Sequence, residues 1–91
     1  MKANEVRLSL TDEQVIHLLT KLGVTNYIET PSAVIFPTLC HNMNIEEASM
    51  KLYYYRNSKL FQCYTECGDC FDIFELYRRY WALRGVDKPF Y

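Results

Sequence analysis

Hydrophobic residues recur along the chain with two different periods, and each period predicts one kind of element. From Thr11 onward they lie three or four positions apart, which predicts an amphipathic helix that stops at Gly23. Thr11 followed by Gln14 is the capping-box pattern that begins such a helix. The apolar stripe consists of Val15, Leu18, Leu19 and Leu22. His17 lies off this stripe, so we expect it to face solvent.

Two pairs of β-rich runs follow, each around a turn. Strands are predicted over residues 27–30, 33–36, 50–55 and 59–64. Pro31-Ser32 connects the first pair, and Pro37 ends it. The polar segment 56–58 suits a hairpin with three to four loop residues between the second pair. Side chains alternate between the faces of a strand, so we expect one face to be covered and the other wet.

The helical period returns near the end of the chain. Gly68-Asp69 is expected to open a final helix that Asp69 or Asp72 caps and that runs to Gly85. Its stripe consists of Ile73, Leu76, Tyr77, Tyr80 and Leu83. Residues 86–91 are expected to form a tail. The predicted fold is therefore α+β, a single domain over residues 1–91 in which an N-terminal and a C-terminal helix flank an antiparallel sheet.

A chain of 91 residues buries only a small core, so we expect a covalent or metal link to help hold it together. Its four cysteines, at positions 40, 63, 67 and 70, can supply that link. The first residues lack the apolar run of a secretory signal, and no stretch is long enough to span a membrane. We therefore expect a cytoplasmic protein, and in a reducing compartment metal binding is favoured over disulfides.

Two candidate ligand pairs each follow a predicted hairpin. Cys40-His41 comes directly after the first, and Cys63 with Cys67 ends the second, which is the layout of a zinc ribbon. The spacing of Cys67 and Cys70 leaves an alternative with four cysteine ligands, in which Cys70 replaces His41. Otherwise Cys70 is a small buried side chain on the first turn of the final helix. His41 is either a ligand or a loop histidine bonded to backbone.

Four segments carry a resemblance to a known family. They are Cys40-His41, Lys51-Leu52-Tyr53-Tyr54-Tyr55, the run from Phe61 through Cys63 and Cys67 to Asp69, and Phe71 to Leu76. Over about residues 10–84 the chain resembles the zinc-binding domain of bacterial and phage DNA primases, in its short prophage or mobile-element version. The resemblance implies one structural zinc on Cys40, His41, Cys63 and Cys67, leaves Cys70 as an extra, and implies contact with single-stranded template.

This sequence departs from that family in two ways. Family members usually place two residues between the first cysteine and histidine, which are adjacent here. The chain also ends before the catalytic domain of a primase, so we expect no primer synthesis from it. With no paired catalytic carboxylates, nucleophile triad or phosphate-binding loop, we expect neither an enzyme nor a small-molecule substrate.

Two functions remain from the sequence. Ten basic and eleven acidic residues give a net charge of −1, so any contact with nucleic acid must be local. One hypothesis is single-stranded DNA binding, with phosphates held by Lys51, Arg56 and Lys59 and bases stacked on Tyr53 and Tyr55. The alternative is a module that docks on a replication or host protein through this hairpin or through Tyr77, Arg78, Tyr80 and Trp81 of the last helix.

Overall fold

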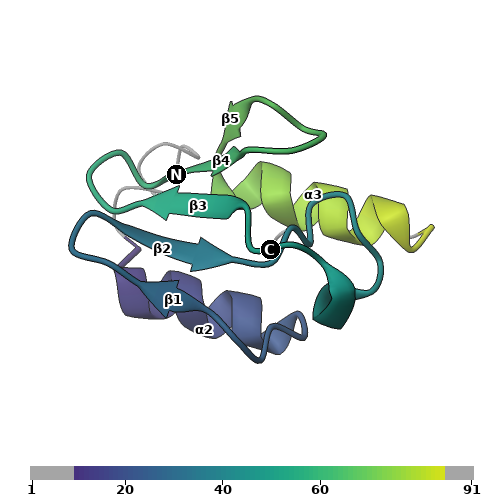
Figure 1. Cartoon of the computed structure of the whole chain (residues 1–91), viewed down its shortest axis with the longest axis horizontal. Helices are drawn as coiled ribbons and strands as arrows, with labels where there is room; N and C mark the ends of the chain where they lie inside the picture. Colours follow the sequence, from purple (N-terminus) through teal and green to yellow (C-terminus); the bar gives the residue numbers. More distant parts are fainter. Residues whose placement is uncertain (1–9, 86–91) are drawn as a thin grey trace.

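The structure, a computed structural model, describes residues 10–85. It is a five-stranded antiparallel sheet with two α-helices behind it (Figure 1). The strands are adjacent in chain order. They are β1 (Ile28–Glu29), β2 (Ala33–Phe36), β3 (Leu52–Tyr55), β4 (Leu60–Cys63) and β5 (Cys70–Phe71). The helices are α2 (Asp12–Lys21), the short 3₁₀ helix η1 (Ile45–Glu47) and α3 (Ile73–Leu83). The predicted α+β class and flanking helices are confirmed.

The first helix begins as its sequence predicts. Thr11 Oγ1 accepts a hydrogen bond from the Gln14 backbone N–H, and Gln14 Oε1 accepts one from the Thr11 N–H, so both halves of the capping box are present. Helix α2 ends just before Gly23, whose φ of +113° is a conformation that residues with a Cβ rarely adopt. Val15 and Leu19 point into the core, while His17 is exposed as expected.

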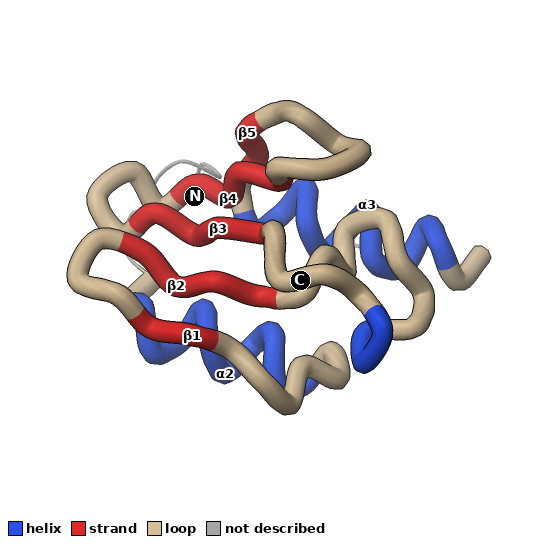
Figure 2. Tube along the Cα trace, viewed as in Figure 1, coloured by secondary structure: helices blue, strands red, loops and turns tan. Residues whose placement is uncertain are grey.

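The core lies between the sheet and the two helices, which cover the same face (Figure 2). The register aligns Val34, Tyr54, Phe61 and Phe71 across β2 to β5, and all four are buried. Apolar side chains from both helices pack with this row in the core. At the far side of the core the Tyr80 hydroxyl of α3 donates a hydrogen bond to the Leu22 carbonyl, 2.8 Å away, and so ties the two helices together.

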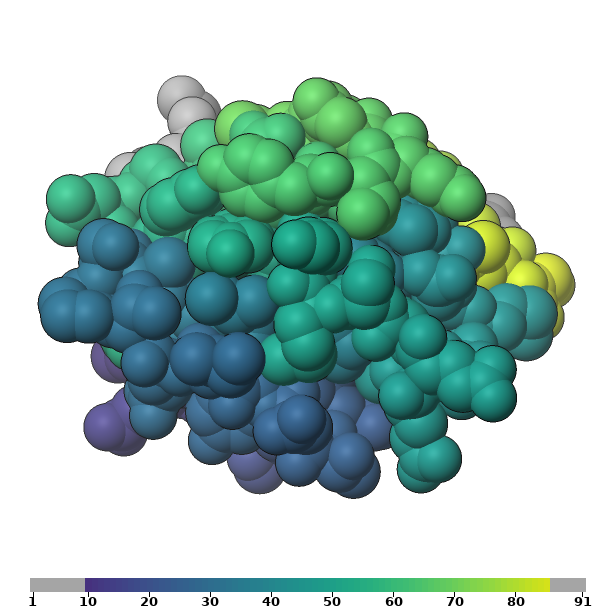
Figure 3. Space-filling view, viewed as in Figure 1, coloured from purple at the N-terminus to yellow at the C-terminus, as the bar shows by residue number. Residues whose placement is uncertain are grey.

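Within residues 10–85 no helix lies on the opposite face of the sheet, which is called the open face below. Its cross-strand row consists of Ile28, Ile35, Tyr53, Gln62 and Cys70. Figure 3 looks onto this side, where α2 (purple) is visible only at the lower edge. Ile28 is 49% exposed, and Ile35, Tyr53 and Gln62 are half-buried. The predicted difference between a covered and a wet face is confirmed.

The segment before α3 differs from its prediction. The helix begins at Ile73 and not at Gly68-Asp69; Asp72 caps it by accepting a hydrogen bond from the Glu75 N–H at 2.9 Å. Residues Cys70 and Phe71 instead form β5, because Phe71 pairs with Phe61 and buries its ring in the core. Strand alternation then turns Cys70 to the open face. The expectation of a buried Cys70 on a helix is wrong, and the predicted tail lies outside the described residues.

Candidate metal centre

Four side chains from two distant segments meet at one end of the sheet. Cys40 and His41 come from the turn after β2, and Cys63 and Cys67 from the end of β4 and the loop behind it. One ligand atom from each residue lies within 4.8 Å of the other three. Cys40 and Cys63 are buried, and His41 and Cys67 are half-buried. This is the set that the primase resemblance implied, and the structure groups it together.

A tight turn explains how adjacent residues can both reach the centre. The backbone N–H groups of His41 and Asn42 donate to the Thr38 carbonyl, at 3.3 Å and 3.1 Å. The Asn42 side chain donates a further hydrogen bond to Thr38 Oγ1 at 2.7 Å, and Thr38 is fully buried. Because this turn is anchored on Thr38, it presents Cys40 and His41 to the same space.

The second segment approaches from β4. Cys63 pairs with Leu52 on the covered face, so its sulfur points toward the core side of the sheet end. The chain turns through residues 64–67, and Gly68 follows with a φ of +66°. Cys67 Sγ then lies 3.4 Å from Cys40 Sγ. Thr65 Oγ1 lies between the two segments, 2.8 Å from His41 Nε2 and 3.3 Å from Cys63 Sγ.

The three thiols have different acidities. Burial raises the pKa of Cys40, and the neighbouring Cys67 and Cys63 raise it further. Burial also raises the pKa of Cys63, but hydrogen bonds from Thr65, the Cys67 backbone and Cys40 outweigh this effect and lower the pKa to about 6. The pKa of Cys67 is raised by burial, against the pull of Cys40 and Arg79. Of the three thiols, Cys63 is the one whose pKa is lowered, which favours the thiolate, the form that binds metals.

The donor set fits a soft or borderline metal ion. Three sulfurs and one imidazole are ligands that zinc prefers, whereas calcium and magnesium require oxygen. With zinc–sulfur bonds of about 2.3 Å, two sulfurs of a tetrahedral site lie about 3.8 Å apart. The separation of the Cys40 and Cys67 sulfurs, 3.4 Å, needs only a small adjustment to match. The four residues can hold a metal ion without rearrangement of the strands.

His41 also has outer partners. Its Nε2 lies 2.8 Å from Thr65 Oγ1, which in turn lies 3.3 Å from Cys63 Sγ. Its Nδ1 lies 3.1 Å from Asn42 Nδ2 and 3.6 Å from Glu66 Oε2. A ligating histidine usually donates its second N–H to an oxygen, which fixes the ring. Of these two neighbours Glu66 offers such an oxygen, whereas Asn42 presents its amide nitrogen, which is a donor. Neither residue was singled out in the sequence, and only the nearness of Glu66 to His41 indicates this role.

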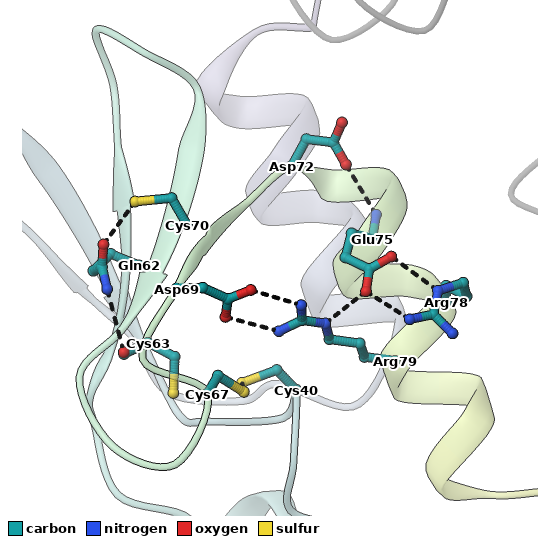
Figure 4. Close-up of polar contacts among 10 residues, drawn as sticks. All are labelled: Cys40, Gln62, Cys63, Cys67, Asp69, Cys70, Asp72, Glu75, Arg78 and Arg79. Carbon is teal, nitrogen blue, oxygen red and sulfur yellow. Dashed lines mark hydrogen bonds and ion pairs between the residues drawn. The ribbon is translucent and has the colours of Figure 1, made fainter.

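Cys70 is not part of the cluster. Its thiol is exposed on the open face and lies 2.6 Å from Gln62 Oε1. In Figure 4 the Cys70 sulfur points toward Gln62 and away from the sulfurs of Cys63 and Cys67. The geometry therefore does not support the alternative with four cysteine ligands, since the sheet separates Cys70 from the other three.

The residues predicted to contact DNA fall into two groups. Tyr53 and Tyr55 lie together on the open face with ring centroids 6.1 Å apart. Lys51 is exposed just before β3. At the other end of the hairpin, Arg56 Nη1 lies 2.8 Å and Lys59 Nζ 3.5 Å from the Asp12 carboxylate. The hairpin cations are thus engaged within the protein, which the sequence did not predict.

A third tyrosine joins the open face. Tyr64 is 55% exposed, and its ring meets that of Tyr53 edge-on with centroids 5.0 Å apart. Its hydroxyl also contacts the hydroxyl of Tyr55. Tyr64 ends the strand predicted over residues 59–64, but it was not among the residues predicted to contact DNA. The alternation Gln62, Cys63, Tyr64 was the signal that could have placed it opposite the buried Cys63.

Comparison with known proteins gives one relative. The chain is 42% identical over 88 residues to the SPbeta prophage-derived uncharacterized protein YorJ of Bacillus subtilis (strain 168). The match covers 96% of this chain but 23% of that protein, so the chain spans about a quarter of the relative's length. No protein-family model and no solved structure matches. The resemblance to the primase zinc-binding domain therefore stays a prediction.

Neither α2 nor α3 is long and apolar enough to cross a membrane.

Proposed function

We propose that the chain is a zinc-binding, non-catalytic module that binds single-stranded DNA through the open face of its sheet. The zinc half is supported by the Cys40, His41, Cys63 and Cys67 cluster. Four protein ligands leave a tetrahedral ion no open position for substrate, so such a zinc stabilises the fold and does not catalyse. In a domain with so small a core, its binding energy is largely folding energy.

The observation that carries the DNA half is the cluster of Tyr53, Tyr55 and Tyr64 on the open face. The centroids of the three rings lie 5.0 to 6.1 Å from a neighbouring ring, and no helix of the described part of the chain covers them. Unpaired bases stack on such rings whatever their sequence, at about 1–3 kcal/mol per base. Bases in a duplex are already stacked on each other, so this face favours single strands.

The charges around the cluster favour modest, salt-sensitive affinity. Lys51 is exposed beside Tyr64, whose N–H donates to the Lys51 carbonyl at 2.9 Å. Arg56 and Lys59 form ion pairs with Asp12, which makes their charges less available to phosphates. If all three cations meet phosphates, the logarithm of the affinity falls by about 2 for each tenfold rise in salt.

The relative supports a setting for this activity. It is described as derived from the SPbeta prophage, and the primase zinc-binding domain that the chain resembles contacts single-stranded template. We therefore place the module in phage or mobile-element replication. A replication or host protein is the alternative partner for the same face, since exposed tyrosines also make good protein anchors.

Fluorescence anisotropy with labelled single-stranded and duplex oligonucleotides, measured on zinc-loaded protein over a range of salt, tests the DNA half. We expect single strands to bind more tightly, and Tyr53→Ala with Tyr64→Ala to weaken binding at least tenfold. Tyr27→Ala is the matched control: this tyrosine is 36% exposed but packs on Phe36, on the covered side of the sheet. Absence of binding at low salt would reject DNA and leave the protein partner.

A further inference from the structure

We infer that Arg79 is a positioning residue for the metal centre: through Asp69 it clamps the loop that carries Cys67 onto helix α3. The inference rests on the zinc site proposed above. It is independent of the DNA half of that proposal, because Arg79 lies on the covered side of the sheet, where its guanidinium contacts the buried Phe71 ring.

The clamp is a two-point ion pair. Asp69 follows Cys67 by two residues, and its Oδ1 and Oδ2 accept hydrogen bonds from Arg79 Nη1 and Nη2 at 3.2 Å and 3.0 Å (Figure 4). A planar guanidinium that meets both oxygens of a carboxylate fixes orientation as well as distance. The loop is therefore held in one direction relative to α3.

Arg79 is itself held in place. Its Nε donates to Glu75 Oε2 at 2.7 Å, one helical turn earlier, and its guanidinium carbon lies 4.3 Å from the centroid of the Phe71 ring. Arg78 binds the same Glu75 carboxylate from the solvent side. These contacts lower the pKa of Glu75 to about 2, so it stays charged. The clamp thus stands on a rigid part of the molecule.

The polar side-chain contacts of the loop before Gly68 lie within the centre. Within residues 10–85, Thr65, Glu66 and Cys67 contact His41, Cys63 and Cys40, and Cys67 also packs against the core. Gly68 adds conformational freedom, and no atom lies within 4 Å of where its Cβ would be. Asp69 thus supplies the side-chain tie between this loop and helix α3.

The guanidinium also suits the charge of the loaded centre. Three thiolates, one neutral imidazole and a divalent ion sum to −1, because −3 and +2 leave one negative charge. Arg79 is held close to the Cys67 loop by its ion pair with Asp69, two residues after Cys67. Loss of Arg79 therefore removes both the loop clamp and a compensating positive charge.

The test compares Arg79→Met with Arg78→Met in the full chain. Both variants remove one guanidinium from neighbouring positions of α3, and both alter contacts with Glu75, but only Arg79 reaches Asp69. Zinc affinity is measured by competition with a chromogenic chelator. Partners of metal ligands typically change affinity 10–100-fold when lost. We expect a loss of that size for Arg79→Met and under threefold for Arg78→Met.

Cobalt substitution separates positioning from a general loss of stability. The visible absorption of Co²⁺ reports the geometry of its thiolate and imidazole ligands. We expect the bands to shift in Arg79→Met, to be unchanged in Arg78→Met, and to return toward wild type in Arg79→Lys, which keeps the charge. If Arg79→Met fails to fold, Asp69→Asn tests the same contact from the exposed loop, with the same expected direction.

Unchanged zinc affinity and unchanged cobalt bands in folded Arg79→Met, or in Asp69→Asn, would overturn the inference. Absence of zinc binding by the wild type would overturn it together with the proposed zinc site. A wild type that binds zinc but no oligonucleotide would reject the DNA half of the proposed function, and the clamp would stand or fall on the variants alone.

Discussion

The carboxylate of Asp12 lies 2.8 Å from the guanidinium of Arg56, although 44 residues separate the two in the chain. Lys59 and the Tyr54 hydroxyl approach the same carboxylate, at 3.5 Å and 3.4 Å. The first turn of α2 thereby holds the tip of the β3–β4 hairpin. It also pairs with the two cations that were predicted to meet DNA phosphates, and Glu29 is a second partner of Arg56 at 3.4 Å.

Asp12→Asn should therefore strengthen oligonucleotide binding at low salt. The amide has no charge, so Lys59 and, apart from its contact with Glu29, Arg56 become available to phosphates. The lost ion pairs cost about 1 kcal/mol of stability or less because they are partly exposed. Anisotropy titrations and urea unfolding measure the two effects. Glu13→Gln removes an equal charge from the same exposed turn without touching Arg56, and equal affinity gains in both variants would argue against release of the cations.

One zinc per chain is expected, and its loss should unfold the protein. Coordination by a small zinc domain is worth of order 10 kcal/mol, which is comparable to the whole stability of a typical domain, about 5–15 kcal/mol. Cys40→Ser, Cys63→Ser and Cys67→Ser should each give metal-poor chains that lack the wild-type circular dichroism. Elemental analysis checks the stoichiometry. Well-folded wild-type protein with almost no metal would contradict the prediction.

Cys70→Ala is the matched control for these three substitutions. Because this thiol is exposed on the open face, its removal should change stability by no more than about 0.5 kcal/mol and leave zinc bound. His41→Ala should lower zinc content, since it removes one of the four grouped ligands. The opposite pattern, with zinc lost from Cys70→Ala and kept in His41→Ala, would establish a site of four cysteines.

Tyr80→Phe should destabilise the fold by about 1–2 kcal/mol, because it removes the buried hydrogen bond to the Leu22 carbonyl that joins α3 to α2. Tyr27→Phe removes a hydroxyl from an exposed ring and should be neutral. Urea denaturation of the zinc-loaded proteins measures both. Similar midpoints for the two variants would mean that the contact between the helices contributes little.

Residues close in sequence determined much of this protein. Thr11 and Gln14 begin α2 through hydrogen bonds that span three residues, and the alternation along residues 52–55 assigns Tyr54 to the core and Tyr53 and Tyr55 to the open face. The pairs Cys40-His41 and Cys63 with Cys67 each follow a strand, so the hairpins bring them together. Capping, alternation and short turns depend on neighbours along the chain, and they are therefore legible in the sequence.

Tertiary contacts decided the rest. Phe71 belongs to β5 because its ring packs beside Phe61 in the core. This pairing places Cys70 away from both the helix and the metal cluster. Asp12 forms an ion pair with Arg56, and Arg79 forms one with Asp69. The partners lie too far apart in the chain for a local sequence pattern to link them. Packing space and long-range charge pairing depend on how the elements meet in three dimensions, which is why only the folded structure could place these residues.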